Sequence, residues 1–205
     1  MIVIIDYGMG NLGSVVNMLK KLGVETVVSS DKDAIKKASK LILPGVGAFD
    51  NGMKNLRDRN LIPLLNEKVL EERITILGLC LGMQLYTRGS EEGRMPGLGW
   101  LDAETVSFRF EGVNANLKVP HMGWNTIEIC QSHPLFAEMN NESRFYFVHS
   151  YHVVCKETGT VVAQTDHGYM FPSAIAKENI LGVQFHPEKS HNFGMKLFKN
   201  FVERL

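Results

Sequence analysis

The segment ITILGLC, residues 74–80, is the strongest constraint on the fold, because it predicts a strand that is apolar on both faces. Strands of this kind occur where helices cover both sides of a parallel sheet. Other strand-like runs and helical patterns alternate before it, with strands at 1–6, 24–30 and 40–45 and helices at 12–22, 31–38 and 58–73. This alternation predicts a doubly wound α/β fold.

The second half of the sequence contains closely spaced strand-like runs with few helical patterns between them. These runs are residues 104–110, 118–129, 144–155, 160–165, 172–178 and 180–186. Their close spacing predicts antiparallel additions to the sheet, and an amphipathic helix is expected from 191 to 205. We therefore expect a single α/β domain over residues 1–205, with three layers, a mostly parallel sheet and antiparallel strands in the C-terminal half.

Charge and cysteine content argue against several classes of function. The sequence has 22 Lys plus Arg and 22 Asp plus Glu, so no overall field favours nucleic acid or a membrane surface. The apolar run at residues 2–5 is too short for a signal peptide, and we expect no bilayer-spanning segment. Three cysteines without Cys-x-x-Cys spacing argue against disulfides or structural zinc and fit a reducing cytoplasm. No metal or organic cofactor is expected.

The segment GLCLGMQ, residues 78–84, has the pattern of a nucleophile elbow. Gly78 and Gly82 flank Cys80 at the tight turn between a strand and a helix, where larger side chains would collide. The N-terminus of the following helix favours a thiolate and leaves N–H groups free for an oxyanion. The alternative is a buried structural cysteine beside packing glycines, and the strand and helix context favours the nucleophile.

A cysteine nucleophile needs a base, and the base needs a group that orients it. His186 and Glu188 in the segment HPE are two residues apart, so they project to the same side of an extended backbone. Pro187 stiffens the backbone between them. On spacing alone, a polar strand end without catalytic function explains the segment equally well.

The segment LPGVGAF, residues 43–49, ends a predicted parallel strand and opens onto the same edge of the sheet as the elbow. An N–H group of Val46 or Gly47 is placed to bind a developing oxyanion together with that of Leu81. An ordinary turn between a strand and a helix accounts for the pattern equally well.

Gly8, Gly10 and Gly13 have the G-x-G-x-x-G spacing of dinucleotide-binding turns, and Asp31 follows at about the position of a ribose-binding acid. Asp6 argues against this function, because its carboxylate would repel a pyrophosphate. The antiparallel second half also leaves no room for a second mononucleotide-binding unit. The alternative is a sharp turn at Gly8 and Gly10, with Gly13 letting the next helix pack close to the sheet.

The elbow, the HPE segment and the LPGVGAF segment together resemble the class I, triad-type glutamine amidotransferases over the whole chain. DYGMGN, LPGVGAF, KVPHMGWN and YFVHSY further resemble one subfamily, the glutaminase subunits of imidazole glycerol phosphate synthase. The resemblance implies that Cys80 is the nucleophile, His186 the general acid and base, and Glu188 its orienter. It also implies a set of residues that hold the substrate glutamine: Gly47, Gln84, Glu92, His149, Ser150 and Tyr151.

The resemblance implies a partner as well, because ammonia in neutral water is largely protonated and the chain has no space for an acceptor site. The expected partner is a cyclase subunit with a (β/α)₈ barrel, in a heterodimer that uses no nucleic acid or membrane. Asn11, His121 and Lys189 are the expected partner-facing residues. NLGSV and residues 90–105 look closer to a paralogous branch found with surface-polysaccharide genes, so ammonia supply to a sugar-amidating synthase is an alternative. A non-catalytic or dinucleotide-binding module is the alternative of a different class.

Overall fold

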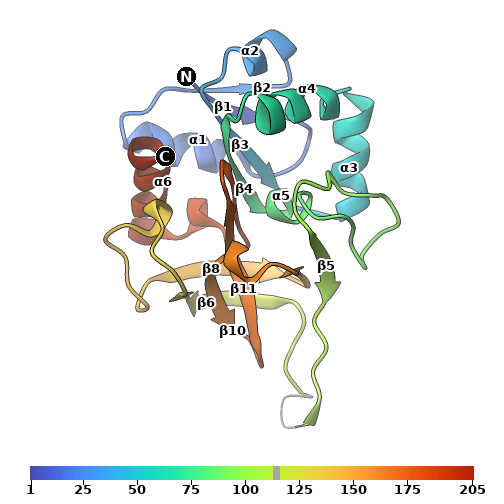
Figure 1. The fold of residues 1–205 in the computed structure, drawn as a ribbon. Coiled ribbons are helices and arrows are strands. Elements are labelled where there is room, and N and C mark those ends of the chain that lie inside the picture. Colours follow the sequence, from blue (N-terminus) through green and yellow to red (C-terminus); the bar gives the residue numbers. More distant parts are fainter. Residues whose placement is uncertain (113–115) are drawn as a thin grey trace.

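The computed structural model describes residues 1–112 and 116–205 and is built around a sheet in the order β2-β1-β3-β4-β12-β11-β10-β7 (Figure 1). Its parallel strands are β2 (Thr26–Ser29), β1 (Ile2–Ile5), β3 (Lys40–Gly45), β4 (Thr75–Cys80) and β12 (Ile180–Val183). The antiparallel additions are β11 (Met170–Lys177), β10 (Val161–Asp166) and β7 (Glu128–Ile129). The predicted mostly parallel α/β sheet is therefore confirmed.

Strand register brings three chain segments together at one edge of the sheet. β4 lies between β3 and β12, with Gly45 opposite Cys80 and Val183 opposite Leu79. Since all three strands run in the same direction, the residues that follow them leave the sheet at the same edge. This places the elbow beside both the LPGVGAF loop and the HPE segment.

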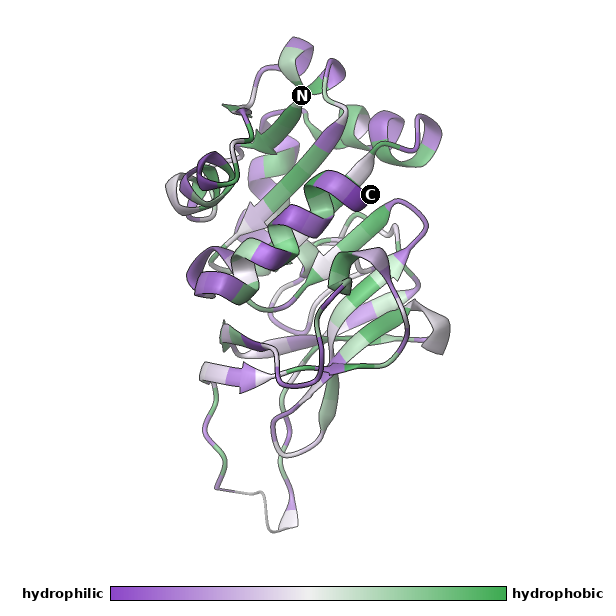
Figure 2. Ribbon diagram, turned by 90° about the vertical axis from the view of Figure 1, so that its left-hand side faces the viewer, coloured by the Kyte–Doolittle hydropathy of each residue, from purple (hydrophilic) through white to green (hydrophobic). Residues whose placement is uncertain are grey.

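Helices cover both faces of the sheet (Figure 1). α1 (Leu12–Lys21) and α6 (His191–Arg204) pack on one core, and α2 (Lys32–Lys36), α3 (Phe49–Asp58) and α4 (Ile62–Asn66) contribute to the other. The residues of β1 alternate between the two cores, which explains why the strand is apolar on both faces. In Figure 2 the sheet strands are mostly hydrophobic, whereas α6 alternates hydrophobic and hydrophilic residues. None of the helices in the described ranges could cross a membrane.

The expected helix over 58–73 is wrong at its start. Asp58 ends α3, and Asn60 has a φ of 51°, which breaks the helix before α4 begins at Ile62. A π-helical turn, Glu67–Glu71, continues α4. The sequence pattern did not predict α3, because the buried side of this helix includes Gly52, which packs against Leu85.

Two small antiparallel ladders complete the C-terminal half. β5 (Ala103–Ser107) pairs with β9 (Tyr151–Cys155), and β6 (His121–Thr126) pairs with β8 (Arg144–His149). The run 144–155 was expected as continuous strand-like sequence, but it changes partner at Ser150, which lies between β8 and β9. Ser150 at this corner lines the same cleft as Cys80.

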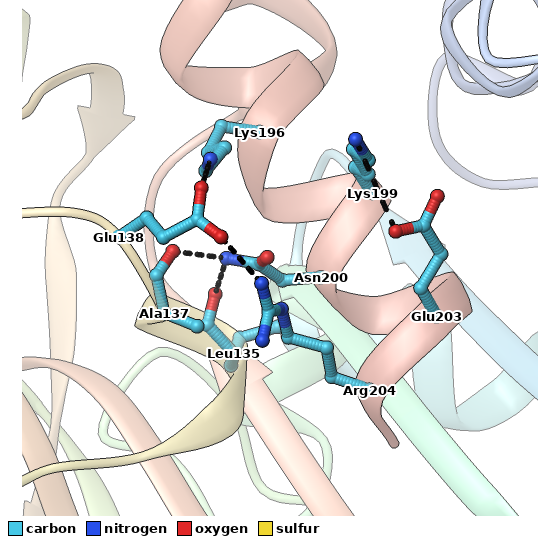
Figure 3. A network of polar contacts seen from close by, with 8 residues as sticks. All are labelled: Leu135, Ala137, Glu138, Lys196, Lys199, Asn200, Glu203 and Arg204. Carbon is cyan, nitrogen blue, oxygen red and sulfur yellow. Dashed lines mark hydrogen bonds and ion pairs between the residues drawn. The ribbon is translucent and has the colours of Figure 1, made fainter.

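The expected C-terminal helix is confirmed as α6, and a polar network fixes it to the turn Pro134–Phe136 and the residues that follow it (Figure 3). Buried Asn200 donates from Nδ2 to the carbonyl oxygens of Leu135 at 3.1 Å and Ala137 at 2.8 Å. Lys196 and Arg204 both pair with Glu138 at the exposed rim of this contact. The buried amide satisfies two backbone acceptors, so α6 is held in a defined position against the sheet.

Candidate active site

Cys80 lies at the end of β4 in a backbone conformation that residues with a side chain rarely adopt. Its φ is 52° and its ψ is −108°, and α5 (Leu81–Gln84) begins at the next residue. Strain of this kind at a non-glycine residue costs about 1–3 kcal/mol and is concentrated at functional sites. Cys80 is 7% exposed, so its sulfur is shielded but reachable.

The glycines on either side of Cys80 are required by close contacts. A Cβ atom on Gly82 would lie 1.8 Å from the carbonyl oxygen of Leu43 in β3. A Cβ atom on Gly78 would lie 2.7 Å from the backbone nitrogen of Met83. The elbow is therefore pressed against β3 and against its own helix, which leaves no space for larger residues at these positions.

His186 follows β12 and is held by its backbone and by Glu188. Its N–H donates to the carbonyl oxygen of Tyr146 at 2.8 Å, and its carbonyl oxygen accepts from Oγ of Ser190 at 2.6 Å. Nδ1 of the ring lies 2.8 Å from Oε1 of Glu188, and both side chains are almost fully buried. The expected pairing is present, although Glu188 lies in a 3₁₀ turn, Pro187–Lys189, rather than in extended backbone.

The charges around His186 favour its imidazolium form. Burial alone would lower the pKa of His186, but the negative charge of Cys80, the nearness of its sulfur and the Glu188 carboxylate raise that pKa to about 10. Nε2 of His186 is buried and has no hydrogen-bond partner in the part of the chain described. A loose contact between base and nucleophile is usual before substrate binds.

Cys80 opens into a cleft of about 390 Å³ that is lined by all six of the expected substrate-binding residues. Val46, Gly47, Leu81, Gln84 and Glu92 line it, together with the corner residues His149, Ser150 and Tyr151. Oε2 of Glu92 accepts a hydrogen bond from the N–H of Phe49 at 2.8 Å. This contact fixes the carboxylate at the start of α3.

Backbone N–H groups are available near the sulfur on two sides. Leu81 is the first residue of α5, so its N–H has no partner within that helix. Gly47 has a φ of 118°, and a Cβ atom there would lie 2.9 Å from Met9, so the loop after β3 depends on glycine at this position. The two elements expected to bind an oxyanion thus line one cleft.

Two buried polar side chains near Cys80, those of Gln184 and Tyr7, were not identified from the sequence. Gln184 is fully buried and donates from Nε2 to the sulfur of Cys80 at 3.6 Å. The signal that could have found it is its position two residues before His186, in the same strand-end segment. The phenol of Tyr7 is also buried, and burial followed by the charge of Cys80 raises its pKa far above the usual value.

The three residues expected to face a partner lie in different environments. Asn11 and Lys189 are exposed, and Nζ of Lys189 lies 5.7 Å from the ring centroid of Tyr146. His121 differs from the expectation, because its side chain is buried and Nδ1 lies 3.0 Å from Nε2 of His149. The exposed large apolar side chains of the same strand are Met122 at 62% and Trp124 at 47% exposure.

The turn at residues 8–13 is occupied by its own side chains. Oδ1 of Asp6 accepts the N–H of Gly8 at 3.0 Å, and Oδ1 of Asn11 caps α1 at the N–H of Ser14 at 3.3 Å. These contacts use the donors that a pyrophosphate would need. The expectation that Gly13 lets α1 pack close to the sheet is wrong, because a Cβ atom there would have no neighbour within 4 Å.

Comparisons with known proteins point to one family. The chain matches the family described as glutamine amidotransferase class-I over residues 3–205. Proteins named imidazole glycerol phosphate synthase subunit HisH 2 are similar over their whole length. The one from Methanococcus maripaludis is 51% identical over 100% of both chains, and the one from Pseudomonas aeruginosa is 51% identical over 99% of both. A solved glutamine amidotransferase shares the fold with a TM-score of 0.73 at 21% identity, over 98% of this chain and 97% of its own.

Proposed function

The chain belongs to the class I glutamine amidotransferase family, and from this premise we propose that it is the glutaminase subunit of an imidazole glycerol phosphate synthase. It hydrolyses glutamine to glutamate and ammonia and passes the ammonia to a cyclase subunit. The observation that carries the proposal is the strained Cys80 at the bottom of a cleft, beside a histidine that a buried carboxylate orients.

In the proposed mechanism, the thiolate of Cys80 attacks the side-chain amide carbon of glutamine. The electron pair of the carbonyl bond moves to oxygen, and N–H groups of Leu81 and of Val46 or Gly47 stabilise the oxyanion. The imidazolium of His186 protonates the leaving nitrogen, and ammonia departs as the carbonyl reforms in a thioester. His186 then removes a proton from water, which attacks the thioester and releases glutamate and the thiolate.

The cleft supplies groups that fit the rest of the glutamine molecule. Glu92 is the only carboxylate among the described residues that line the cleft, and it suits the positive α-ammonium group of the substrate. Gln84 and the corner His149–Ser150–Tyr151 also line the cleft. Gln84 is held in place because its Nε2 donates to the carbonyl oxygen of Tyr151 at 3.0 Å.

The partner in this proposal is a cyclase with a (β/α)₈ barrel. Exposed Met122 and Trp124 on β6 form an apolar surface, and Val119 is also exposed next to this strand. Large exposed apolar side chains that cluster on one strand are typical of an interaction site. Asn11 and Lys189 are the exposed polar residues proposed for the same interface.

A second acceptor is favoured by one specific observation. Both relatives at 51% identity carry the numeral 2 in their names, which indicates organisms with more than one subunit of this name. A duplicated subunit is free to supply ammonia to another synthase, such as one that amidates a surface sugar. Growth of a deletion strain without histidine separates these acceptors, because only the histidine pathway predicts auxotrophy.

The glutaminase activity itself is tested by measuring glutamate release, with and without a cyclase partner. Cys80→Ala is expected to abolish release in both conditions, because the thioester cannot form. Cys130→Ala is the matched control, since Cys130 is a second free cysteine that is exposed and outside the cleft. Glutamate release that persists in Cys80→Ala would show that the assigned nucleophile is wrong.

A further inference from the structure

A chain of hydrogen bonds connects the substrate cleft to the sulfur of Cys80 through a buried amide. Gln84 donates from Nε2 to the carbonyl oxygen of Tyr151 and to Oε1 of Gln184, each at 3.0 Å. Gln184 in turn donates from Nε2 to the sulfur of Cys80 at 3.6 Å. Gln184 and Gln84 are both buried, so the contacts are shielded from water.

The donor and acceptor roles in this series of hydrogen bonds are determined by the carbonyl oxygen of Tyr151. The carbonyl oxygen of Tyr151 only accepts hydrogen bonds, so the amide nitrogen of Gln84 must face it. The second hydrogen of that nitrogen points to Gln184, which must present its oxygen to receive it. The amide nitrogen of Gln184 is therefore the group that faces the sulfur. A flipped amide would place two NH₂ groups against each other and an oxygen against the thiolate.

We propose that Gln184 is a further residue of the catalytic site, which stabilises the thiolate of Cys80 by donating a hydrogen bond to it. This inference rests on the proposed function, in which the thiolate is the nucleophile. A buried charge requires donors around it, and His186 and Gln184 approach the same sulfur through different side chains. Gln84 has a positioning role, because it fixes which end of the Gln184 amide faces the sulfur.

The test measures the thiolate directly, without turnover. The rate of alkylation of Cys80 by iodoacetamide is followed against pH by mass spectrometry of the Cys80 peptide. Gln184→Met has nearly the same length but no donor, so its alkylation midpoint is expected to rise by about one pH unit. At pH values well below the midpoint, the rate is then about tenfold lower than in the parent protein at the same pH. The Cys130 peptide provides the internal reference, because its rate should not change.

A matched variant separates this effect from a general disturbance of the elbow. Tyr7→Phe removes a buried hydroxyl that is close to Cys80 but makes no hydrogen bond within the described residues. Its alkylation midpoint is expected to stay at the parent value. If Tyr7→Phe shifts the midpoint as far as Gln184→Met does, the specific role of Gln184 is overturned.

Gln84→Met keeps Gln184 but removes the group that orients it. A smaller upward shift of the same midpoint is expected, because the Gln184 amide is then free to rotate. The inference is overturned if Gln184→Met has the alkylation midpoint of the parent protein. If Gln184→Met does not fold, a parent-like midpoint in Gln84→Met overturns it instead. The proposed function fails separately, through glutamate release in Cys80→Ala, which the alkylation profile does not measure.

Discussion

Two glycine-rich turns of this protein look alike in the sequence but differ in what their glycines do. Residues 8–13 lead from the end of β1 into the first turn of α1, and residues 78–82 pass directly from the end of β4 into α5, each at the end of a parallel strand. In the first turn the glycines themselves take the left-handed backbone, with φ values of 82° at Gly8 and 92° at Gly10. In the second turn Cys80 takes it, with a φ of 52°, and the glycines only make room.

The first turn therefore has a structural role only, whereas the second turn positions a reactive side chain. Glycine adopts a positive φ without steric cost, so the turn at Gly8 and Gly10 is relaxed. A cysteine in the same region is strained, and the strain is tolerated because β3 and α5 hold the residue on both sides. In this conformation the sulfur of Cys80 lies beyond the end of the strand and lines the cleft.

The largest effect is expected for Gly82→Ala. The added methyl group would overlap the carbonyl oxygen of Leu43, and neither backbone segment can move without disturbing the sheet. We expect a loss of about 4 kcal/mol or more in the free energy of unfolding, or no folded protein. Urea denaturation followed by circular dichroism measures it. A loss below about 1 kcal/mol would show that the elbow is less tightly packed than the structure indicates.

A smaller loss is expected for Gly10→Ala in the first turn. Here the cost comes from the φ of 92°, together with Cβ contacts of 3.1 Å to the side chain of Pro44 and 3.2 Å to the backbone of Pro44 and Gly45, which are much less severe than the 1.8 Å overlap at Gly82. We expect a loss of about 2 kcal/mol, with glutamate release retained by the folded protein. If Gly10→Ala were as damaging as Gly82→Ala, the two turns would not differ in packing and the comparison would fail.

The strain at Cys80 itself predicts an order of stability between two inactive variants. Cys80→Ala keeps the strained backbone, whereas Cys80→Gly relieves it, and both remove the sulfur. We expect Cys80→Gly to be more stable than Cys80→Ala by about 1 kcal/mol, in the opposite sense to a substitution in a regular strand. Thermal unfolding of the two proteins side by side gives the difference. A more stable Cys80→Ala would mean that the elbow carries no strain.

These contrasts show what the sequence could predict. Alternating strands and helices, together with the elbow at Cys80, were sufficient for the parallel part of the sheet and for the cleft at its edge. The nearness of His186 to Glu188 followed from their spacing, although the turn between them did not. Local pattern was adequate wherever the relevant contacts were close in the chain.

The features that were not predicted depend on contacts distant in sequence. His121 is buried because His149, which lies on the paired strand, faces it, and no local pattern contains that pairing. The strand change at Ser150 is set by different partners, β6 on one side and β5 on the other. The amide direction of Gln184 depends on Gln84, which lies 100 residues away along the chain.

The smallest effect, and the only stabilising one, is expected for Gly13→Ala. Gly13 lies in the first turn of α1, is exposed, and has open space where a Cβ atom would be. Alanine there restricts the unfolded chain and favours the helix, so we expect a gain of about 0.5 kcal/mol in the free energy of unfolding. The measurement is urea denaturation of the isolated chain, with Gly82→Ala as the opposite extreme. A loss of stability would show that Gly13 packs more closely than the structure has it, and that this glycine, like those of the elbow, is required by its contacts.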